Sequence, residues 1–259
     1  MIPLTGTPKP ILIKACLNGP RVKSEHPRVP VTADEIATDA RIAVDAGAGA
    51  LHFHPRGADG RETLDPGPCG EAVTRVRELC PGISLGLSTA KWIVGNPAER
   101  LDAVRSWKVL PDFASVNFNE RGYSSLCRLL LELGIGFEVG VWSRADAVRL
   151  VKSKLDGSCT RILVEMTEKD PGRAVNLTNE IEAYLERSGV AAPRLHHGYG
   201  LTAWSVMNNA IRTGKDIRVG LEDTLVLPDG TRSKGNGELI ESAVRLAKRF
   251  GRDTTNSVS

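Results

Sequence analysis

The pattern of hydrophobic and polar positions changes repeatedly along the chain. Short apolar runs typical of buried strands alternate with segments whose apolar residues have the spacing of amphipathic helices. Short apolar runs predict strands at residues 11–17, 50–56, 84–89, 113–118, 136–142, 161–167, 194–199 and 216–223. Apolar residues at helical spacing predict helices at 32–46, 70–80, 97–107, 123–133, from 143 onward, and at 172–187, 202–212 and 237–250. Each predicted strand is therefore followed by one predicted helix.

Local signals support several of these boundaries. Thr32 followed three residues later by Glu35 reads as a capping box, which predicts that the first helix begins after Thr32. Gly47 directly follows that helix and is typical of a helix carboxyl end. Ser143 is a candidate N-cap for the fifth helix, and Asp59-Gly60 predicts a turn after the second strand.

Unbroken alternation of strands and helices favours parallel strands joined by helical crossovers. Eight strand–helix units in a chain of 259 residues predict a (β/α)8 TIM barrel, a fold that commonly takes about 250 residues. The alternative is an open Rossmann-like sheet, but Asn18-Gly19-Pro20 after the first strand lacks the GxGxxG spacing. No linker interrupts the alternation, so we expect a single domain over residues 1–259.

Composition and charge narrow the class of protein. Hydrophobic residues make up 41% of the chain and charged residues 25%, as in ordinary globular proteins. A formal net charge of +3 with no block of basic residues argues against nucleic acid binding. The five cysteines form no CxxC motif, and the chain shows no signal-type or membrane-spanning apolar segment. We therefore expect a cytoplasmic protein with reduced thiols that does not enter a membrane.

Two histidines lie two residues apart in the second predicted strand. Since alternate side chains of a strand share a face, His52 and His54 would project together, away from Leu51 and Phe53. Two converging neutral imidazoles can supply two of the three protein ligands of a catalytic zinc site. The alternative is a pair of histidines hydrogen-bonded inside the barrel.

The eighth predicted strand supplies acids that could complete such a site. In a TIM barrel the active site lies at the carboxyl ends of the strands, so Glu222 could reach across the mouth and complete a His2Glu zinc site. Asp223 is then a spare carboxylate able to act as general base, with Arg218 holding it ionised or binding a substrate carboxylate. The alternative for Glu222 is a salt bridge to Arg56 or Arg218.

Further polar side chains occur where a purely structural strand would be continuously apolar. The hydroxyl, amide and charged groups of these side chains could bind a substrate. The hydroxyl and amide groups could equally be caps at the strand ends. For His197, a hydrogen bond within the barrel is favoured over a fourth zinc ligand, because a fourth ligand would close the position that catalysis needs. The other candidates are Asn18, Arg56, Ser88, Thr89, Ser115 and Asn117, together with Glu138 and Glu165 inside the fifth and sixth strands.

Two segments in combination are specific: His52-Phe53-His54-Pro55-Arg56 and Arg218-Val219-Gly220-Leu221-Glu222-Asp223. With them the chain resembles the β-keto acid cleavage enzymes of the 3-keto-5-aminohexanoate cleavage type, from the first strand to the last helix. The other matching stretches are Ala15-Cys16-Leu17-Asn18-Gly19, Pro30-Val31-Thr32 with Glu35, Ala46-Gly47-Ala48, Leu87-Ser88-Thr89, Ser115-Val116-Asn117, and Asn236 with Glu238-Leu239.

The resemblance implies a TIM barrel with bound Zn2+ that converts a β-keto acid and acetyl-CoA into acetoacetate and a CoA ester. It also implies a homo-oligomer, either a tetramer or a dimer. By motif position, His52, His54 and Glu222 would be the zinc ligands, Asp223 the base oriented by Arg218, and Ser88 and Glu138 part of the substrate site. The family usually continues with glycines after Ser88-Thr89, whereas this chain has Ala90-Lys91-Trp92, which puts the identity of the substrate in question.

Two other functions would use the same residues. A zinc-dependent aldolase or hydrolase on a TIM barrel would need no CoA, although hydrolases of this architecture often add histidines where this chain has Glu138 and Glu165. A non-catalytic, metal-stabilised barrel would hold its zinc with four protein ligands, and His197 would be the fourth.

Overall fold

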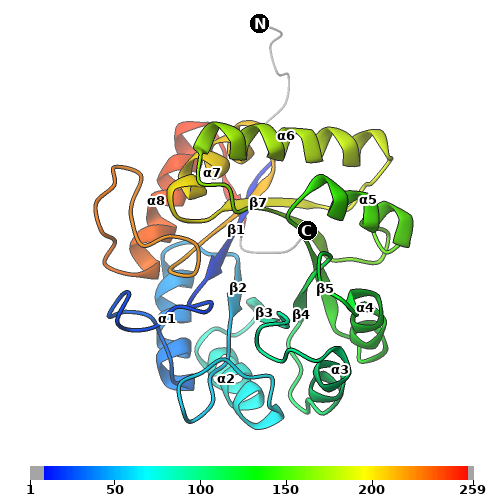
Figure 1. Cartoon of the computed structure of the whole chain (residues 1–259). Helices are drawn as coiled ribbons and strands as arrows, with labels where there is room; N and C mark the ends of the chain where they lie inside the picture. The colour runs from blue at the N-terminus through cyan, green and yellow to red at the C-terminus, as the bar shows by residue number, and fades with distance from the viewer. Residues whose placement is uncertain (1–8, 256–259) are drawn as a thin grey trace, which may run out of the picture.

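Eight parallel strands close into a barrel at the centre of the computed structural model, which describes residues 9–255 (Figure 1). From β2 to β8 each strand pairs with the next along the chain, and β1 pairs with both β8 and β2, which closes the ring. The strands are β1 (Ile11–Cys16), β2 (Ala50–Phe53), β3 (Ser84–Ser88), β4 (Phe113–Asn117), β5 (Gly136–Val141), β6 (Arg161–Met166), β7 (Arg194–Gly198) and β8 (Asp216–Val219).

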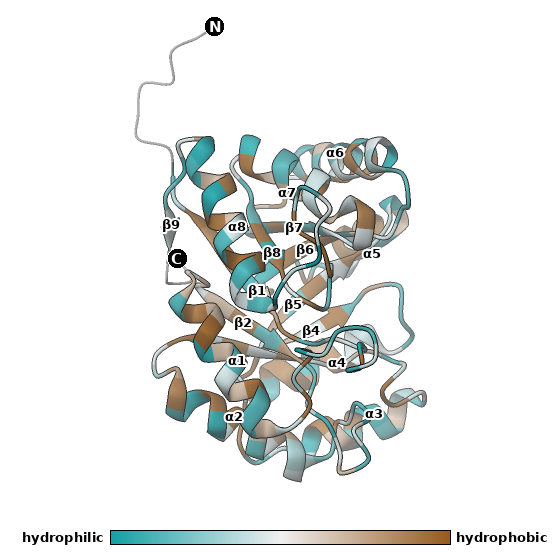
Figure 2. Cartoon of the chain, turned by 90° about the vertical axis from the view of Figure 1, so that its left-hand side faces the viewer, coloured by the Kyte–Doolittle hydropathy of each residue, from teal (hydrophilic) through white to brown (hydrophobic). Residues whose placement is uncertain are grey.

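A helix follows each strand and covers the outside of the barrel (Figure 1). Figure 2 shows hydrophobic residues on the strands and on the helix sides that face them, with polar residues outward. No described helix combines the length and apolar character needed to cross a membrane. The helices are α1 (Ala33–Asp45), α2 (Pro66–Leu79), α3 (Pro97–Arg105), α4 (Tyr123–Glu132), α5 (Arg144–Ser153), α6 (Pro171–Arg187), α7 (Ala203–Arg212) and α8 (Asn236–Arg249), with a short 3-10 helix η1 (Gly200–Thr202) before α7.

The predicted (β/α)8 barrel is confirmed, and the open Rossmann-like alternative is wrong because β1 is bonded on both sides. A short ninth strand that the periodicity did not predict, β9 (Thr254–Thr255), pairs with the start of β1. Residues 1–8 and 256–259 lie outside the described part of the chain, so a single domain over the full length stays a prediction.

The predicted capping signals are confirmed. The hydroxyl of Thr32 accepts a hydrogen bond from Glu35 N at 3.1 Å, and the carboxylate of Glu35 accepts one from Thr32 N at 3.2 Å. Ser143 likewise accepts from Asp146 N at 3.3 Å, and α5 begins at the next residue. One N–H group in the first turn of each helix is thereby satisfied by the side chain of the N-cap residue.

Strand β8 is shorter than predicted, and the prediction that residues 216–223 form one strand is wrong. After Val219 the chain turns sharply, because Asp223 N and Thr224 N both donate to the carbonyl of Gly220, at 2.9 and 3.0 Å. A Cβ on Gly220 would lie 1.9 Å from the carbonyl oxygen of Cys16, so only glycine fits where the turn presses against β1. Glu222 and Asp223 therefore leave the barrel on a turn and not on alternate faces of a strand.

Below the carboxyl ends of the strands, the barrel interior holds a buried cluster of charges. Glu138 on β5 pairs with Lys14 Nζ at 2.5 Å and with Arg161 Nε at 3.3 Å, and all three residues are at most 1% exposed. Each charge that is removed from water here has a partner of opposite sign, as buried ions require. The cluster forms a polar floor beneath the site described next.

Candidate functional site

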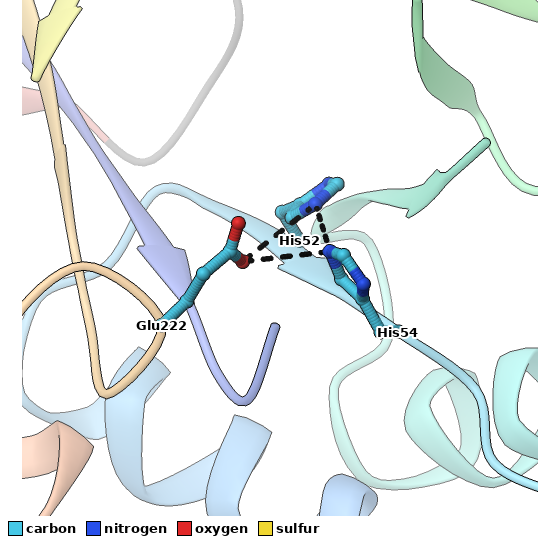
Figure 3. A group of neighbouring side chains, drawn as sticks. All are labelled: His52, His54 and Glu222. Atoms are coloured by element: carbon cyan, nitrogen blue, oxygen red, sulfur yellow. Dashed lines mark hydrogen bonds and ion pairs between the residues drawn. The ribbon is translucent and has the colours of Figure 1, made fainter. Parts of the chain in front are cut away.

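His52, His54 and Glu222 converge at the carboxyl end of the barrel (Figure 3). Glu222 Oε2 lies 3.8 Å from His52 Nε2 and 3.7 Å from His54 Nε2, and the two ring nitrogens are 3.2 Å apart. All three side chains are buried. His52 is in β2, and His54 follows the end of that strand. Glu222 comes from the turn after β8, which lies on the other side of β1 in the ring.

The chemistry of these donors fits a divalent cation of the zinc type. Zinc bound to nitrogen and oxygen at about 2.0–2.2 Å in a tetrahedron keeps its ligand atoms about 3.3–3.6 Å apart, which is close to the separations here. Glu222 Oε2, which faces both rings, is buried and accepts no hydrogen bond from any described residue. Burial lowers the pKa of His52 well below its usual value, with the neighbouring His54 acting in the same direction, so its imidazole is neutral and can be a ligand.

The loop after β1 holds this group in place. The side-chain amide of Asn18 donates to the carbonyl of His54 at 2.9 Å, and its oxygen accepts from His54 N at 2.9 Å. Gly19 has φ of +53°, and a Cβ there would lie 2.3 Å from Glu222 Cγ. A side chain at Gly19 would thus push Glu222 away from the two histidines.

Glu62 contacts the other nitrogen of His54. Glu62 Oε1 lies 2.5 Å from His54 Nδ1, and Trp92 Nε1 donates to both oxygens of Glu62 at 3.2 Å. Although burial acts to raise it, the pKa of Glu62 is lowered by these contacts and by Arg56. Glu62 is therefore an ionised partner of a candidate metal ligand.

Arg218 joins the two acids that follow β8. Its Nη2 atom donates to Glu222 Oε1 at 2.8 Å and to Asp223 Oδ1 at 2.6 Å, while its Nε atom lies 3.2 Å from both oxygens of Asp223. Burial acts to raise the pKa of Asp223, but Arg218 and then His197 lower it to about 2. Asp223 is therefore a carboxylate at neutral pH, held beside the candidate metal centre.

His197 lies between two acids. Its Nδ1 atom is 3.4 Å from Asp223 Oδ1 and its Nε2 atom is 3.3 Å from Glu165 Oε2. The cluster of candidate metal ligands among residues 9–255 does not include His197. The fourth ligand that a non-catalytic zinc site would need is therefore not supplied by this residue.

A small pocket opens beside the triad, and it contains three of the predicted substrate-binding residues, Ser88, Ser115 and Asn117. Trp142 also lines it, and its Nε1 atom is buried with no hydrogen-bond acceptor among the described residues. An N–H group in this condition is ready to donate to an oxygen of a ligand. The remaining walls are formed by Trp92, Glu165, Tyr199 and Arg218, next to His52, His54 and Glu222.

Five predicted site residues do not line this pocket. Asp223 is fully buried and is bonded to Arg218, which does line it. Thr89 donates to the carbonyl of Ser115 at 2.5 Å, and Asn18 holds the backbone of His54. Arg56 donates to the carbonyls of Gly19 and Arg21 and so anchors the loop after β1. Glu138 forms ion pairs with Lys14 and Arg161 in the floor of the barrel.

Sequence reasoning did not identify Glu62 or Tyr199. Tyr199 follows β7, and its hydroxyl accepts from Arg218 Nη2 at 3.1 Å. The available signal for Glu62 was the Asp59-Gly60 turn, which folds the chain back so that Glu62 pairs with Arg56 in an antiparallel bridge. That signal predicts a reversal of the chain but not the side chain that Glu62 would reach.

Comparison with known proteins gives a consistent result along the whole chain. A family model described as "beta-keto acid cleavage enzyme" matches residues 10–258. A 3-keto-5-aminohexanoate cleavage enzyme of Fusobacterium nucleatum is 29% identical over 261 residues, covering 94% of this chain and 93% of the relative. A 3-oxoadipate:acetyl-CoA acetyltransferase of Cupriavidus necator is 26% identical over 267 residues, covering 94% of this chain and 90% of the relative.

Among solved structures, ObcA in binary complex with oxaloacetate superposes with a TM-score of 0.73 at 18% sequence identity. The match covers 90% of this chain and 66% of that protein, so the present chain spans about two thirds of its length. A ternary complex of ObcA with a C4-CoA adduct and oxalate gives a TM-score of 0.72, also at 18% identity, over 89% of this chain and 66% of that one. At this identity the likeness supports the barrel fold.

Proposed function

The chain belongs to the β-keto acid cleavage enzyme family, and on this premise we propose that it cleaves a β-keto acid in a reaction with acetyl-CoA. The carboxymethyl unit of the β-keto acid is transferred to the acetyl group, which gives acetoacetate. The remaining acyl group is transferred to the sulfur of CoA, which gives a CoA ester. One carbon–carbon bond breaks and one forms, and one thioester is exchanged for another.

One observation carries the proposal: two imidazoles and a carboxylate meet in one pocket, and Arg218, which lines the same pocket, holds a second carboxylate, that of Asp223. We infer that His52, His54 and Glu222 bind zinc, because two neutral imidazoles and one carboxylate form a typical catalytic zinc set with an open position. When bound there, zinc supplies Lewis acidity, which stabilises negative charge on substrate oxygens by several kcal/mol.

The chain's own residues would perform the proton transfer. Asp223 is ionised and can take a proton from the methylene carbon between the keto group and the carboxylate, the acidic C–H of a β-keto acid. Arg218 fixes the orientation of Asp223 and adds positive charge near the carboxylate of the substrate. Ser88, Ser115, Asn117 and Trp142 present polar groups to the pocket and would orient the oxygens of the substrate.

The named relatives support the choice of reactants. Two curated relatives are called 3-keto-5-aminohexanoate cleavage enzymes, from Fusobacterium nucleatum and, at 29% identity over 264 residues, from Acetoanaerobium sticklandii. The relative from Cupriavidus necator is named for acetyl-CoA and 3-oxoadipate, itself a β-keto acid. These names support a β-keto acid and acetyl-CoA as the two substrates of this chain.

The test is a two-product assay. Purified protein loaded with zinc is incubated with acetyl-CoA and a panel of β-keto acids that differ in side chain, and acetoacetate and CoA esters are measured by mass spectrometry. We expect equal amounts of both products and no cleavage when acetyl-CoA is left out. Cleavage that proceeds at the same rate without acetyl-CoA would instead support the aldolase alternative.

We also propose that the protein works in the cytoplasm as a homo-oligomer, a dimer or a tetramer. Light scattering during size-exclusion chromatography measures the assembly directly. A mass of two or four chains is expected, and a mass of one chain at micromolar concentration would contradict the proposal.

A further inference from the structure

The two nitrogens of His54 face different partners. Nε2 points to Glu222 Oε2 and His52 Nε2, at 3.7 and 3.2 Å, whereas Nδ1 lies 2.5 Å from Glu62 Oε1. A carboxylate can only accept a hydrogen bond, so in the neutral form of the ring the proton belongs on Nδ1. The lone pair is then on Nε2, the atom that faces the other two candidate metal ligands.

Glu62 is itself held from two sides. The segment that carries it folds back on the end of β2, with Gly57 N donating to the carbonyl of Arg61 at 2.8 Å and Thr63 N to that of Pro55 at 3.0 Å. These bonds fix the backbone on both sides of Glu62. Its side chain is only 12% exposed.

Trp92 completes the arrangement from a different loop. Its indole N–H lies 3.2 Å from both oxygens of Glu62, so Glu62 is held between Trp92 and His54. Trp92 lines the pocket and is 48% exposed, on the loop after β3. This is the loop where Ala90-Lys91-Trp92 replaces the glycines expected from the family resemblance.

We propose that Glu62 is a positioning residue of the metal centre, which sets the tautomer and ring orientation of His54, and that Trp92 acts on the metal only by fixing Glu62. The proposal rests on the proposed metal site at His52, His54 and Glu222. Acidic partners of histidine ligands raise the metal affinity of a site by about 10- to 100-fold. In this chain the partner connects the metal centre to a loop that also forms the wall of the pocket.

The test measures the zinc affinity of the metal-free full-length protein by competition with a chromophoric chelator. We expect zinc to bind Glu62→Ala about 10- to 100-fold more weakly than the original protein. Glu62→Gln, which keeps an acceptor but not the charge, should lie between them. Glu71→Gln, an exposed acid on α2, is the matched control and should bind zinc as the original protein does.

A double substitution separates direct from indirect action. Trp92→Phe alone should weaken zinc binding several-fold, and Trp92→Phe combined with Glu62→Ala should bind no more weakly than Glu62→Ala alone. Additive losses would overturn the indirect role of Trp92. Unchanged zinc affinity in Glu62→Ala, with circular dichroism showing a folded protein, would overturn the role of Glu62.

A second readout does not depend on metal. The chain has five histidines, so nitrogen-15 NMR of the metal-free protein can assign the tautomer of His54. We expect the proton on Nδ1 in the original protein and a mixture of tautomers in Glu62→Ala. A proton on Nε2 in the original protein would overturn the inference, whereas failure of the original protein to bind zinc would overturn the proposed metal site itself.

Discussion

Arg218 gives two neighbouring acids different environments. Its guanidinium bonds one oxygen of Glu222 and leaves Oε2 facing the histidines, while it contacts both oxygens of Asp223. The planar fork of arginine can serve several acceptors at fixed angles, which the single ammonium group of lysine cannot. This difference supports the proposed division of roles, in which Glu222 binds the metal and Asp223 transfers the proton.

From this assignment, Asp223→Asn should lower kcat by about 10²- to 10⁴-fold, because the amide cannot accept the proton. The zinc content should remain that of the original protein, since Asp223 is not part of the cluster of candidate ligands. Steady-state kinetics and elemental analysis of the same preparation check both halves. Asp65→Asn, at an exposed acid before α2, is the control. If Asp223→Asn turned over at the original rate, Asp223 would not be the base.

At the scale of elements, the sequence predicts regular segments well and the loops that build the site only in part. Apolar periodicity located the eight barrel strands and the eight helices, because burial imposes a repeat of about two or 3.6 residues on each. The segment from Arg218 to Glu222 alternates as a strand does, yet it turns at Gly220, where the cause is the backbone of Cys16, a contact between distant residues. Glu62 was missed for the same reason: its role depends on the contact with His54, which forms only when the loop folds back.

The turn after β8 makes a prediction about Gly220. Gly220→Ala would place a Cβ at 1.9 Å from Cys16 O and 2.8 Å from Asn236 Oδ1, so the turn that carries Glu222 must move. We expect a loss of about 2–4 kcal/mol in the free energy of unfolding together with weaker zinc binding. Gly67→Ala on α2, where a Cβ meets nothing within 4 Å, is the control and should leave stability unchanged or raised. Equal stability of the two variants in urea unfolding would contradict this account of the turn.

An ion cluster between α6 and β7 predicts a pH dependence of stability. Glu182 lies 2.8 Å from both His196 Nε2 and Lys215 Nζ, and although burial acts to raise it, the pKa of Glu182 is lowered by these partners to about 2. Because the pKa is lower in the folded state than its usual 4.5, the stabilisation is present above about pH 4.5 and is lost as pH falls towards 2.

Glu182→Gln should therefore cost about 2 kcal/mol near neutral pH, and the difference from the original protein should shrink between pH 4.5 and 2. Urea unfolding of metal-free protein at several pH values measures that difference. Glu180→Gln, at an exposed position of the same helix, is the control and should show no such trend. A difference between Glu182→Gln and the original protein that stayed constant with pH would contradict the assigned pKa.

At the scale of the whole molecule, the candidate metal centre depends on closure of the barrel. Its histidines come from β2 and the residue after it, and its acid follows β8, so the triad forms only when β1 lies between β8 and β2. A cation bound there would hold together the first and last quarters of the chain. Binding that exists only in the folded state stabilises that state by mass action.

Removal of zinc should consequently lower the melting temperature. At a zinc concentration about 1,000 times Kd the stabilisation is about 4 kcal/mol, which for a chain of this size corresponds to about 10 °C. Calorimetry after chelation and again after zinc is restored measures the change. In His52→Ala the melting temperature should not respond to zinc, and a response equal to that of the original protein would place the metal elsewhere.

The pairing of β9 with β1 determines at which end of the barrel a fused protein or a solid support would lie. Thr254 and Thr255 lie beside Ile11 and Leu12, at the rim opposite the mouth that holds His52 and Glu222. A reporter protein fused next to either segment, or a solid support tethered there, would thus sit behind the barrel. Enzyme immobilised in this way would keep its entrance turned towards the surrounding solution.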